Sequence, residues 1–254
     1  MLRHVAGQDV WVVEKGDAKI TRLFIHCSLG HHETLMPLAS KLPLARNIFF
    51  DLPGHGRSAS WAGTEYHTDA TAIAAALLQG PTHIIGHSFG ATVALRLAAE
   101  YPELVSRATL IEPVMFAAAT SMEAHAAHQI KMEPFIAAWR TQDRIAAAQA
   151  FLGMWGDGSA WGDMSERRRA ALVARIHLIP EVFPAIEGDV HDFLARLAYV
   201  TCPVDLIEGS DSQEIMTAII NGLAGLMPHA CRYKIAGAGH MVPITHADTI
   251  ASFL

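Results

Sequence analysis

Short apolar runs and helical periodicities alternate along the first half of the chain. Apolar or β-branched runs predict strands at 10–13, 23–25, 47–50, 83–85 and 108–111. Apolar positions at helical spacing predict helices over 68–79, which stops at Gly80-Pro81, and over 88–100. Strands that alternate with helices in this way predict a parallel sheet with helices on both faces.

The pattern changes between residues 114 and 200, where no strand is predicted. Helical periodicities appear there at 121–139, 142–153, 164–177 and 188–198. Strands at 204–207 and 232–235 and helices at 213–226 and from about 244 follow. Two strands and two helices could not bury a core of their own. We therefore expect one α/β domain, with its core in 1–113 and 201–254 and a helical lid inserted at 114–200.

The composition fits a globular protein and argues against some classes of partner. Of 254 residues, 51% are hydrophobic and 17% are charged, which allows a large buried core. The net charge of −6 argues against a nucleic-acid partner, since phosphate binding needs clustered Lys and Arg. Three cysteines show no spacing typical of a metal site or a disulfide framework. No signal peptide or membrane span is evident, so we expect a cytoplasmic protein without membrane contact.

The candidate nucleophile is Ser88, in the segment Gly-His-Ser-Phe-Gly at 86–90. A predicted strand runs directly into this segment and a predicted helix leaves it at once. Such a turn strains the serine backbone, and glycines on both sides let the strand and helix approach each other. A serine that only caps the helix would not call for both glycines.

A serine hydroxyl needs a base, and His240 is the best candidate among fifteen histidines. It lies in a glycine-rich loop between the last predicted strand and the last predicted helix, where an imidazole can return over the sheet edge. His87 is inside the serine turn and would point away from the hydroxyl. His125 and His128 lie three apart on a predicted helix, but no further ligands complete a metal site, so no metal is expected.

The imidazole needs a carboxylate to fix its tautomer. Asp211 follows the strand at 204–207 and gives the chain order Ser, Asp, His that this type of site favours. Glu112, at the end of the strand at 108–111, and Glu208 are the alternatives. Asp211 is the preferred prediction.

Acyl transfer also needs hydrogen-bond donors for a tetrahedral oxyanion. The backbone N–H of Phe89, next to the nucleophile, is one predicted donor. The second is expected from the loop at 26–30, as the N–H of Ser28. Met, Phe and Trp are frequent at 114–200, which suggests an apolar pocket for a small, acyl-bearing or aromatic substrate.

Four segments together resemble the α/β-hydrolase superfamily, in particular its lid-bearing branch of esterases, haloperoxidase-like enzymes and related serine hydrolases. They are the His26 loop, the segment Asp-Leu-Pro-Gly-His-Gly-Arg-Ser at 51–58, the turn at 86–90, and the Gly239-His240 loop preceded by Asp211. Relatives usually carry His-Gly at the oxyanion loop, whereas here the second residue is Cys27. The resemblance spans nearly the whole chain and places 114–200 where the family inserts its lid.

The resemblance and the residues together predict a cofactor-free serine hydrolase. Ser88 would attack a carboxylic ester or a related acyl compound and form an acyl-enzyme that water then releases. The same residues could serve carbon–carbon bond hydrolysis, acyl transfer or perhydrolysis. A ligand-binding protein of this fold with little turnover is the alternative from a different class.

Overall fold

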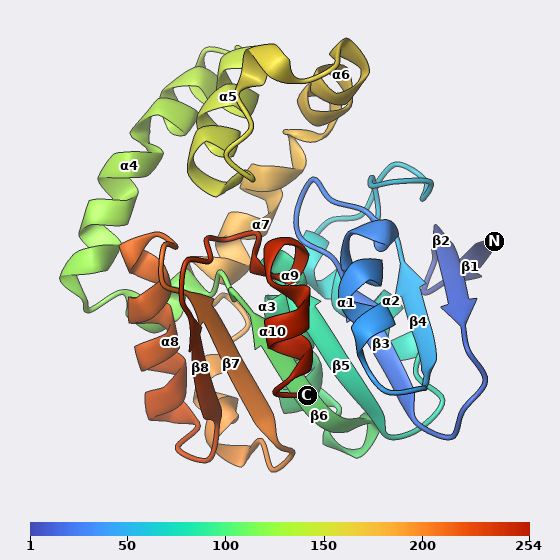
Figure 1. Ribbon diagram of the computed structural model, residues 1–254. Helices are drawn as coiled ribbons and strands as arrows, with labels where there is room; N and C mark the ends of the chain where they lie inside the picture. The colour runs from blue at the N-terminus through green and yellow to red at the C-terminus, as the bar shows by residue number, and fades with distance from the viewer.

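A single twisted sheet of eight strands organises the molecule, and the computed structural model describes residues 1–254 (Figure 1). The order across the sheet is β1-β2-β4-β3-β5-β6-β7-β8. β1 and β2 pair antiparallel, as do β2 and β4, and all other pairs are parallel. The strands are β1 (Leu2–Val5), β2 (Gln8–Lys15), β3 (Thr21–Ile25), β4 (Arg46–Phe50), β5 (Thr82–His87), β6 (Val105–Ile111), β7 (Val204–Gly209) and β8 (Cys231–Ile235).

The central strands are buried on both faces because their side chains alternate between two cores. Leu23 of β3 and Ile84 of β5 belong to the larger apolar cluster of 44 buried residues. Their neighbours Phe24 and Ile85 belong to a second cluster of 14 on the opposite face. Period-two side-chain alternation explains the near-continuous apolar sequence of these strands.

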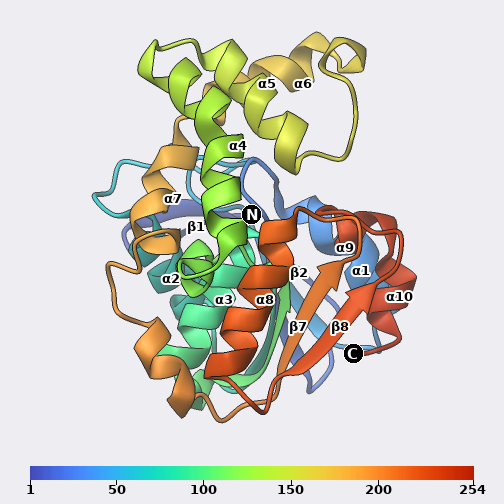
Figure 2. The same ribbon diagram turned by 90° about the vertical axis from the view of Figure 1, so that its left-hand side faces the viewer.

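Helices cover both faces of the sheet (Figures 1 and 2). Helices α2 (Tyr66–Ala76), α3 (Phe89–Glu100) and α8 (Glu214–Leu226) contribute to the larger cluster. The smaller cluster takes residues from α1 (Met36–Lys41), α9 (Val242–Thr245) and α10 (Ala247–Ala251). The fold class predicted from the sequence, an α/β-hydrolase fold, is confirmed.

Between β6 and β7 the chain forms helices only. Its α-helices are α4 (Glu123–Arg140), α5 (Arg144–Trp155), α6 (Glu166–Arg175) and α7 (Leu178–Ile186), and its short 3₁₀ turns are η3 (Phe116–Ala119), η4 (Trp161–Asp163) and η5 (Leu194–Tyr199). Figures 1 and 2 both show α4, α5 and α6 above one end of the sheet. We refer to residues 114–200 as the helical segment. Its helices share a small apolar core of their own around Phe135 and Ile176.

Two features of the helical segment differ from the sequence prediction. Residues 178–186 form α7, which lies in the gap between the predicted helices at 164–177 and 188–198. Pro180 lies in the first turn, where the N–H that proline lacks has no partner within the helix. The predicted helix over 188–198 is wrong, because Asp189 accepts hydrogen bonds from the N–H groups of Phe193 and Leu194 and only η5 follows. No helix of the structure is both long and apolar enough to span a bilayer.

Candidate active site

Ser88 occupies the sharp turn between β5 and α3. Its backbone has φ 55° and ψ −119°, in the left-handed half of conformational space that is costly for a residue with a β-carbon. The N–H of Ser88 donates to the carbonyl of Ile111 on β6, at 2.9 Å, which holds the strained residue in register with the sheet. The side chain is 7% exposed and faces a pocket.

Gly86 and Gly90 are required by close backbone approach on each side of Ser88. A β-carbon at Gly86 would meet the carbonyl group of Gly90, and one at Gly90 would meet the carbonyl oxygen of Ile25. The turn therefore brings α3 against β3 and β5 at distances that only glycine permits.

We expect Gly90→Ala to lower the free energy of unfolding by about 2–4 kcal/mol, because backbone must move to admit the methyl group. Gly153→Ala is the matched control. Nothing lies within 4 Å of a β-carbon at Gly153 in α5, so that substitution should raise stability by about 0.5–1 kcal/mol. Urea denaturation of both variants measures the difference, and equal stabilities would contradict the close-packing explanation.

His240 joins the serine to a carboxylate. Its Nε2 lies 3.0 Å from Ser88 Oγ, and its Nδ1 lies 3.0 Å from Glu112 Oε2. Because a carboxylate accepts hydrogen bonds, Nδ1 carries the hydrogen and Nε2 is left to accept from the serine hydroxyl. The side chain of His240 is 6% exposed, so this arrangement is shielded from bulk water.

Glu112 is completely buried directly after β6. Its Oε1 accepts from the N–H of Gly209, at 2.7 Å, and from Ser212 Oγ, at 2.8 Å. With Oε2 at His240, both carboxylate oxygens have partners, as a buried charge requires. The backbone of Glu112 has φ 51°, an uncommon conformation for a residue with a β-carbon.

The structure places Glu112, and not the expected Asp211, within hydrogen-bond distance of His240. Asp211 is exposed, and its carboxylate accepts from Ser210 Oγ at 2.8 Å instead of contacting His240. Its backbone N–H donates to the carbonyl of Ala238, so the Asp211 loop supports the His240 loop through main-chain atoms. Glu208 accepts from Thr217 Oγ1 on α8 and does not contact His240 either.

Two further residues hold His240 in place and were not assigned that role from the sequence. His87 Nε2 donates to the carbonyl oxygen of His240, at 2.8 Å. Burial lowers the pKa of His87 to about 3, so the ring is neutral when it makes this contact. Trp155, at the end of α5, meets the His240 ring edge-on with centroids 4.8 Å apart. The pentapeptide pattern includes His87, but Trp155 is 85 residues from His240 in sequence and carries no local signal.

The loop at 26–30 lies opposite Ser88, and two buried histidines shape it. His55 Nε2 accepts from the N–H of Leu29, which has φ 62°. His26 donates from Nδ1 to the carbonyl of Cys27 and accepts at Nε2 from the N–H of Leu52. Burial lowers the pKa of His26 to about 4 and that of His55 to about 3, so both rings stay neutral and can accept.

The N–H of Ser28 makes no hydrogen bond within the protein, whereas its neighbour Leu29 does. Phe89 is the first residue of α3, where an N–H has no acceptor in its own helix. Ser28 and Ser88 line the same pocket. Cys27 also lines it, and burial raises the pKa of its thiol to about 12, so the thiol is protonated.

The segment at 51–58 is held tightly beside this loop. Asp51 is fully buried and accepts from the N–H groups of His32 and Arg57, at 2.7 and 2.8 Å. Backbone and imidazole hydrogen bonds outweigh burial and hold the pKa of Asp51 below its usual value. Gly56 has φ 50°, and a β-carbon there would meet the Asp51 carboxylate. The segment thus fixes His55, and through it Leu29, next to the serine.

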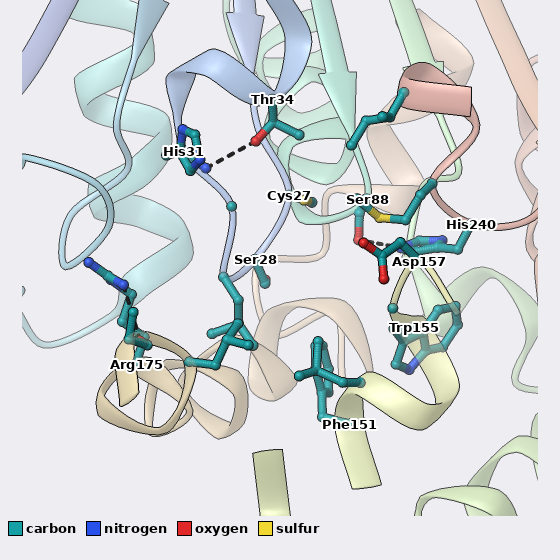
Figure 3. Close-up of a pocket in the computed structure, with 18 of the residues that line it drawn as sticks. Cys27, Ser28, His31, Thr34, Ser88, Phe151, Trp155, Asp157, Arg175 and His240 are labelled. Carbon is teal, nitrogen blue, oxygen red and sulfur yellow. Dashed lines mark hydrogen bonds between the residues drawn. The ribbon is translucent and has the colours of Figure 1, made fainter. Parts of the chain in front are cut away.

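Ser88 lines two spaces of different character. The larger has a volume of about 450 Å³ and is bordered by residues 27–31, His240 and residues of α5 and α6 (Figure 3). The smaller, of about 30 Å³, has apolar walls apart from Ser28 and Ser88. Its apolar lining residues are Val114, Phe116, Met132, Phe151, Trp155, Ile179, Val182, Phe183 and Ile186.

His125 and His128 form no metal site. His125 Nε2 pairs with Glu187 Oε2 at 3.0 Å, and no group of three or more metal-binding side chains is present. His128 stacks on Phe116 with ring centroids 4.4 Å apart. Burial lowers the pKa of His128 to about 4, in keeping with a packing role in the helical segment.

Comparison with known proteins agrees with this fold. Residues 23–253 match the alpha/beta hydrolase family. The chain belongs to this family. Several relatives are named as hydrolases, among them a lipase, a deformylase and a methyl ester esterase.

Individual relatives share only part of the sequence. N-formylmaleamate deformylase of Pseudomonas putida is 28% identical over 212 residues, which are 78% of this chain and 73% of the deformylase. Lipase LipV of Mycobacterium tuberculosis is 37% identical over 103 residues, and the match spans only 39% of either chain. The enol-lactonase of Burkholderia xenovorans superimposes with a TM-score of 0.78 over 100% of this chain and 97% of the lactonase, at 19% identity. That likeness concerns the fold alone.

Proposed function

We propose that this alpha/beta hydrolase cleaves a carboxylic ester or a related acyl compound through Ser88, His240 and Glu112. The observation that carries the proposal is the unbroken series of contacts from the serine hydroxyl to the imidazole and on to a fully buried carboxylate. A serine hydroxyl is inert without such a base, and the base needs the carboxylate to hold its tautomer.

In the first half of the reaction, His240 Nε2 takes the hydroxyl proton while Ser88 Oγ attacks the substrate carbonyl carbon. The negative charge that forms on the carbonyl oxygen accepts from the N–H groups of Ser28 and Phe89. Glu112 stabilises the imidazolium. His240 then gives the proton to the leaving group, and an acyl group remains on Ser88.

In the second half, water replaces the leaving group. His240 takes a proton from the water as it attacks the acyl carbon, and the proton returns to Ser88 Oγ when the acid departs. The helical segment acts as a lid in this proposal. Phe151 and Trp155 supply apolar walls above the nucleophile and shield the oxyanion from bulk solvent, which strengthens its hydrogen bonds.

Covalent labelling with a fluorophosphonate tests the proposed nucleophile. We expect a single phosphonyl adduct on the peptide that contains Ser88, because only a base-activated serine reacts readily with this reagent. Ser88→Ala should take up no label, and Ser28→Ala, which changes a pocket serine but keeps the backbone N–H, should label normally. A folded wild-type sample that stays unlabelled at Ser88 would overturn the proposed mechanism.

A further inference from the structure

The wall of the larger space next to Ser88 carries a net positive charge, although the protein as a whole is negative. The whole chain carries a net charge of −6. The fully charged residues that line this space are Asp157, Arg168 and Arg175. Arg168 Nη2 pairs with Asp157 Oδ2 at 3.0 Å, so these two cancel. Arg175 forms no salt bridge, which leaves one net positive charge on the wall of the pocket.

Arg175 is held in place by carbonyl groups without being neutralised. Its Nε donates to the carbonyl of Gly54 and its Nη1 to the carbonyl of Ala171, both at 3.1 Å. A guanidinium has five N–H donors, so three remain without a protein acceptor. The side chain is half-buried, where the attraction between opposite charges is stronger than in open water.

The position of Arg175 is fixed relative to the reacting atoms. The carbonyl it contacts belongs to Gly54, and the next residue, His55, hydrogen-bonds the N–H of Leu29 beside Ser28. Figure 3 shows Ser88 and Arg175 at opposite sides of the pocket, with Ser28 between them in the view. A substrate bonded to Ser88 would therefore reach Arg175 only with a part distant from its carbonyl group.

The two spaces indicate which part of the substrate would reach Arg175. His240 must protonate the leaving group, and His240 borders the larger space but not the smaller one. The leaving group therefore extends into the larger space, toward Arg175. The acyl group faces the smaller space, whose volume of about 30 Å³ and apolar walls suit a short apolar chain.

From this arrangement, and given the proposed function, we infer that the substrate joins a short apolar acyl group to a leaving group that carries a carboxylate, which Arg175 binds. Charge-assisted hydrogen bonds from a guanidinium to a carboxylate are among the stronger polar contacts in proteins. The remaining N–H donors of Arg175 match that chemistry.

Matched esters test the inference. The acetyl ester of 4-hydroxybenzoate carries a carboxylate on its leaving group, and that of 4-hydroxybenzamide is a neutral counterpart of similar size. We expect the wild-type protein to favour the anionic ester in kcat/KM, and Arg175→Gln to lower the anionic-to-neutral ratio about 10- to 100-fold. The ratio compares the two esters within one variant, so a substitution that slows the hydrolysis of both esters equally leaves the ratio unchanged.

Control variants separate charge recognition from a structural role of Arg175. Arg167→Gln removes the same charge from the same helix at an exposed position outside the pocket, and should leave the ratio unchanged. Arg175→Lys keeps the charge and should retain a ratio several-fold above that of Arg175→Gln. An equal loss of ratio in Arg167→Gln and Arg175→Gln would show a general charge effect and overturn the inference.

The remaining outcomes are also distinct. A wild-type ratio near one would overturn the inference while leaving the proposed hydrolase intact. Preference for monophenyl succinate, whose carboxylate lies on the acyl side, over both acetyl esters would overturn the assignment of the two spaces. Absence of turnover of every ester, together with no fluorophosphonate label on Ser88, would instead contradict the proposed function itself.

Discussion

Glu112→Gln is expected to lower kcat for ester hydrolysis about 10³- to 10⁴-fold with little change in KM. The magnitude follows from known replacements of a triad carboxylate by its amide. The loss should fall on kcat because Glu112 contacts His240 and not the substrate pocket. Steady-state kinetics on one activated ester measures both constants.

The surroundings of Glu112 dictate which way the glutamine amide must face. Oε1 of Glu112 receives hydrogen bonds from the N–H of Gly209 and from Ser212 Oγ. The amide oxygen must take this place, because a fixed backbone donor cannot face an NH₂ group. The NH₂ group then points at His240 Nδ1 and forces Nδ1 to accept. The ring hydrogen moves to Nε2, which can no longer take a proton from Ser88.

Asp211→Asn is the matched control for this prediction. It also replaces a carboxylate by an amide in a loop at the same edge of the sheet, but Asp211 is exposed and contacts Ser210. We expect less than about a fivefold change in kcat, since no charge near the imidazole is lost. A large loss in Asp211→Asn with a small one in Glu112→Gln would contradict the role proposed for Glu112.

The acid illustrates what the sequence could and could not predict at this site. β6 and β7 are neighbouring parallel strands, so residues that follow them reach the same edge of the sheet. Chain order therefore did not separate Glu112 from Asp211. The difference lies in backbone direction, since a positive φ at Glu112 goes with a side chain buried under His240. No local sequence pattern predicts that conformation for a glutamate.

Ser88 and His240 could be chosen as candidates from the sequence because each lies in a short glycine-containing segment next to a predicted strand. Steric conflict at Gly86 and Gly90 depends on residues of the turn itself and of the adjacent strand β3. The contacts from Trp155 and Arg175 could not be predicted, because they depend on how the helical segment packs over the sheet. The buried strands could also be predicted from their apolar runs, whereas α7 fell in the gap between two predicted helices and was not predicted.

Acidification is expected to unfold the protein steeply between about pH 6 and pH 5. Six of its fifteen histidines have pKa values lowered chiefly by burial. The pKa is about 4 for His26 and His128, and about 3 for His55, His67, His83 and His87. Their exposed counterparts in the unfolded chain titrate near 6.5.

The sign of the effect follows from where the protons bind. Above pH 6.5 these histidines are neutral in both states, and the stability from burying them is complete. Below pH 6.5 the unfolded chain binds protons that the folded protein does not, so stability falls until the folded pKa values near 3–4 are reached. Glu187 and Asp189, whose carboxyl pKa values burial raises, act in the opposite direction.

The size of the effect is large because the contributions add. Each buried histidine lowers the free energy of unfolding by about 1.4 kcal/mol per pH unit. Six together lower it by about 8 kcal/mol per pH unit, comparable with the whole stability of a typical domain.

Urea denaturation at pH 8, 7, 6 and 5.5 measures how steeply the free energy of unfolding depends on pH. His83→Gln, at a buried site on β5 remote from Ser88, should reduce the slope by about one proton. His229→Gln, at an exposed position, should leave it unchanged. A free energy of unfolding that stays level from pH 7 to 5.5 would show that the buried imidazoles can be protonated in the folded state.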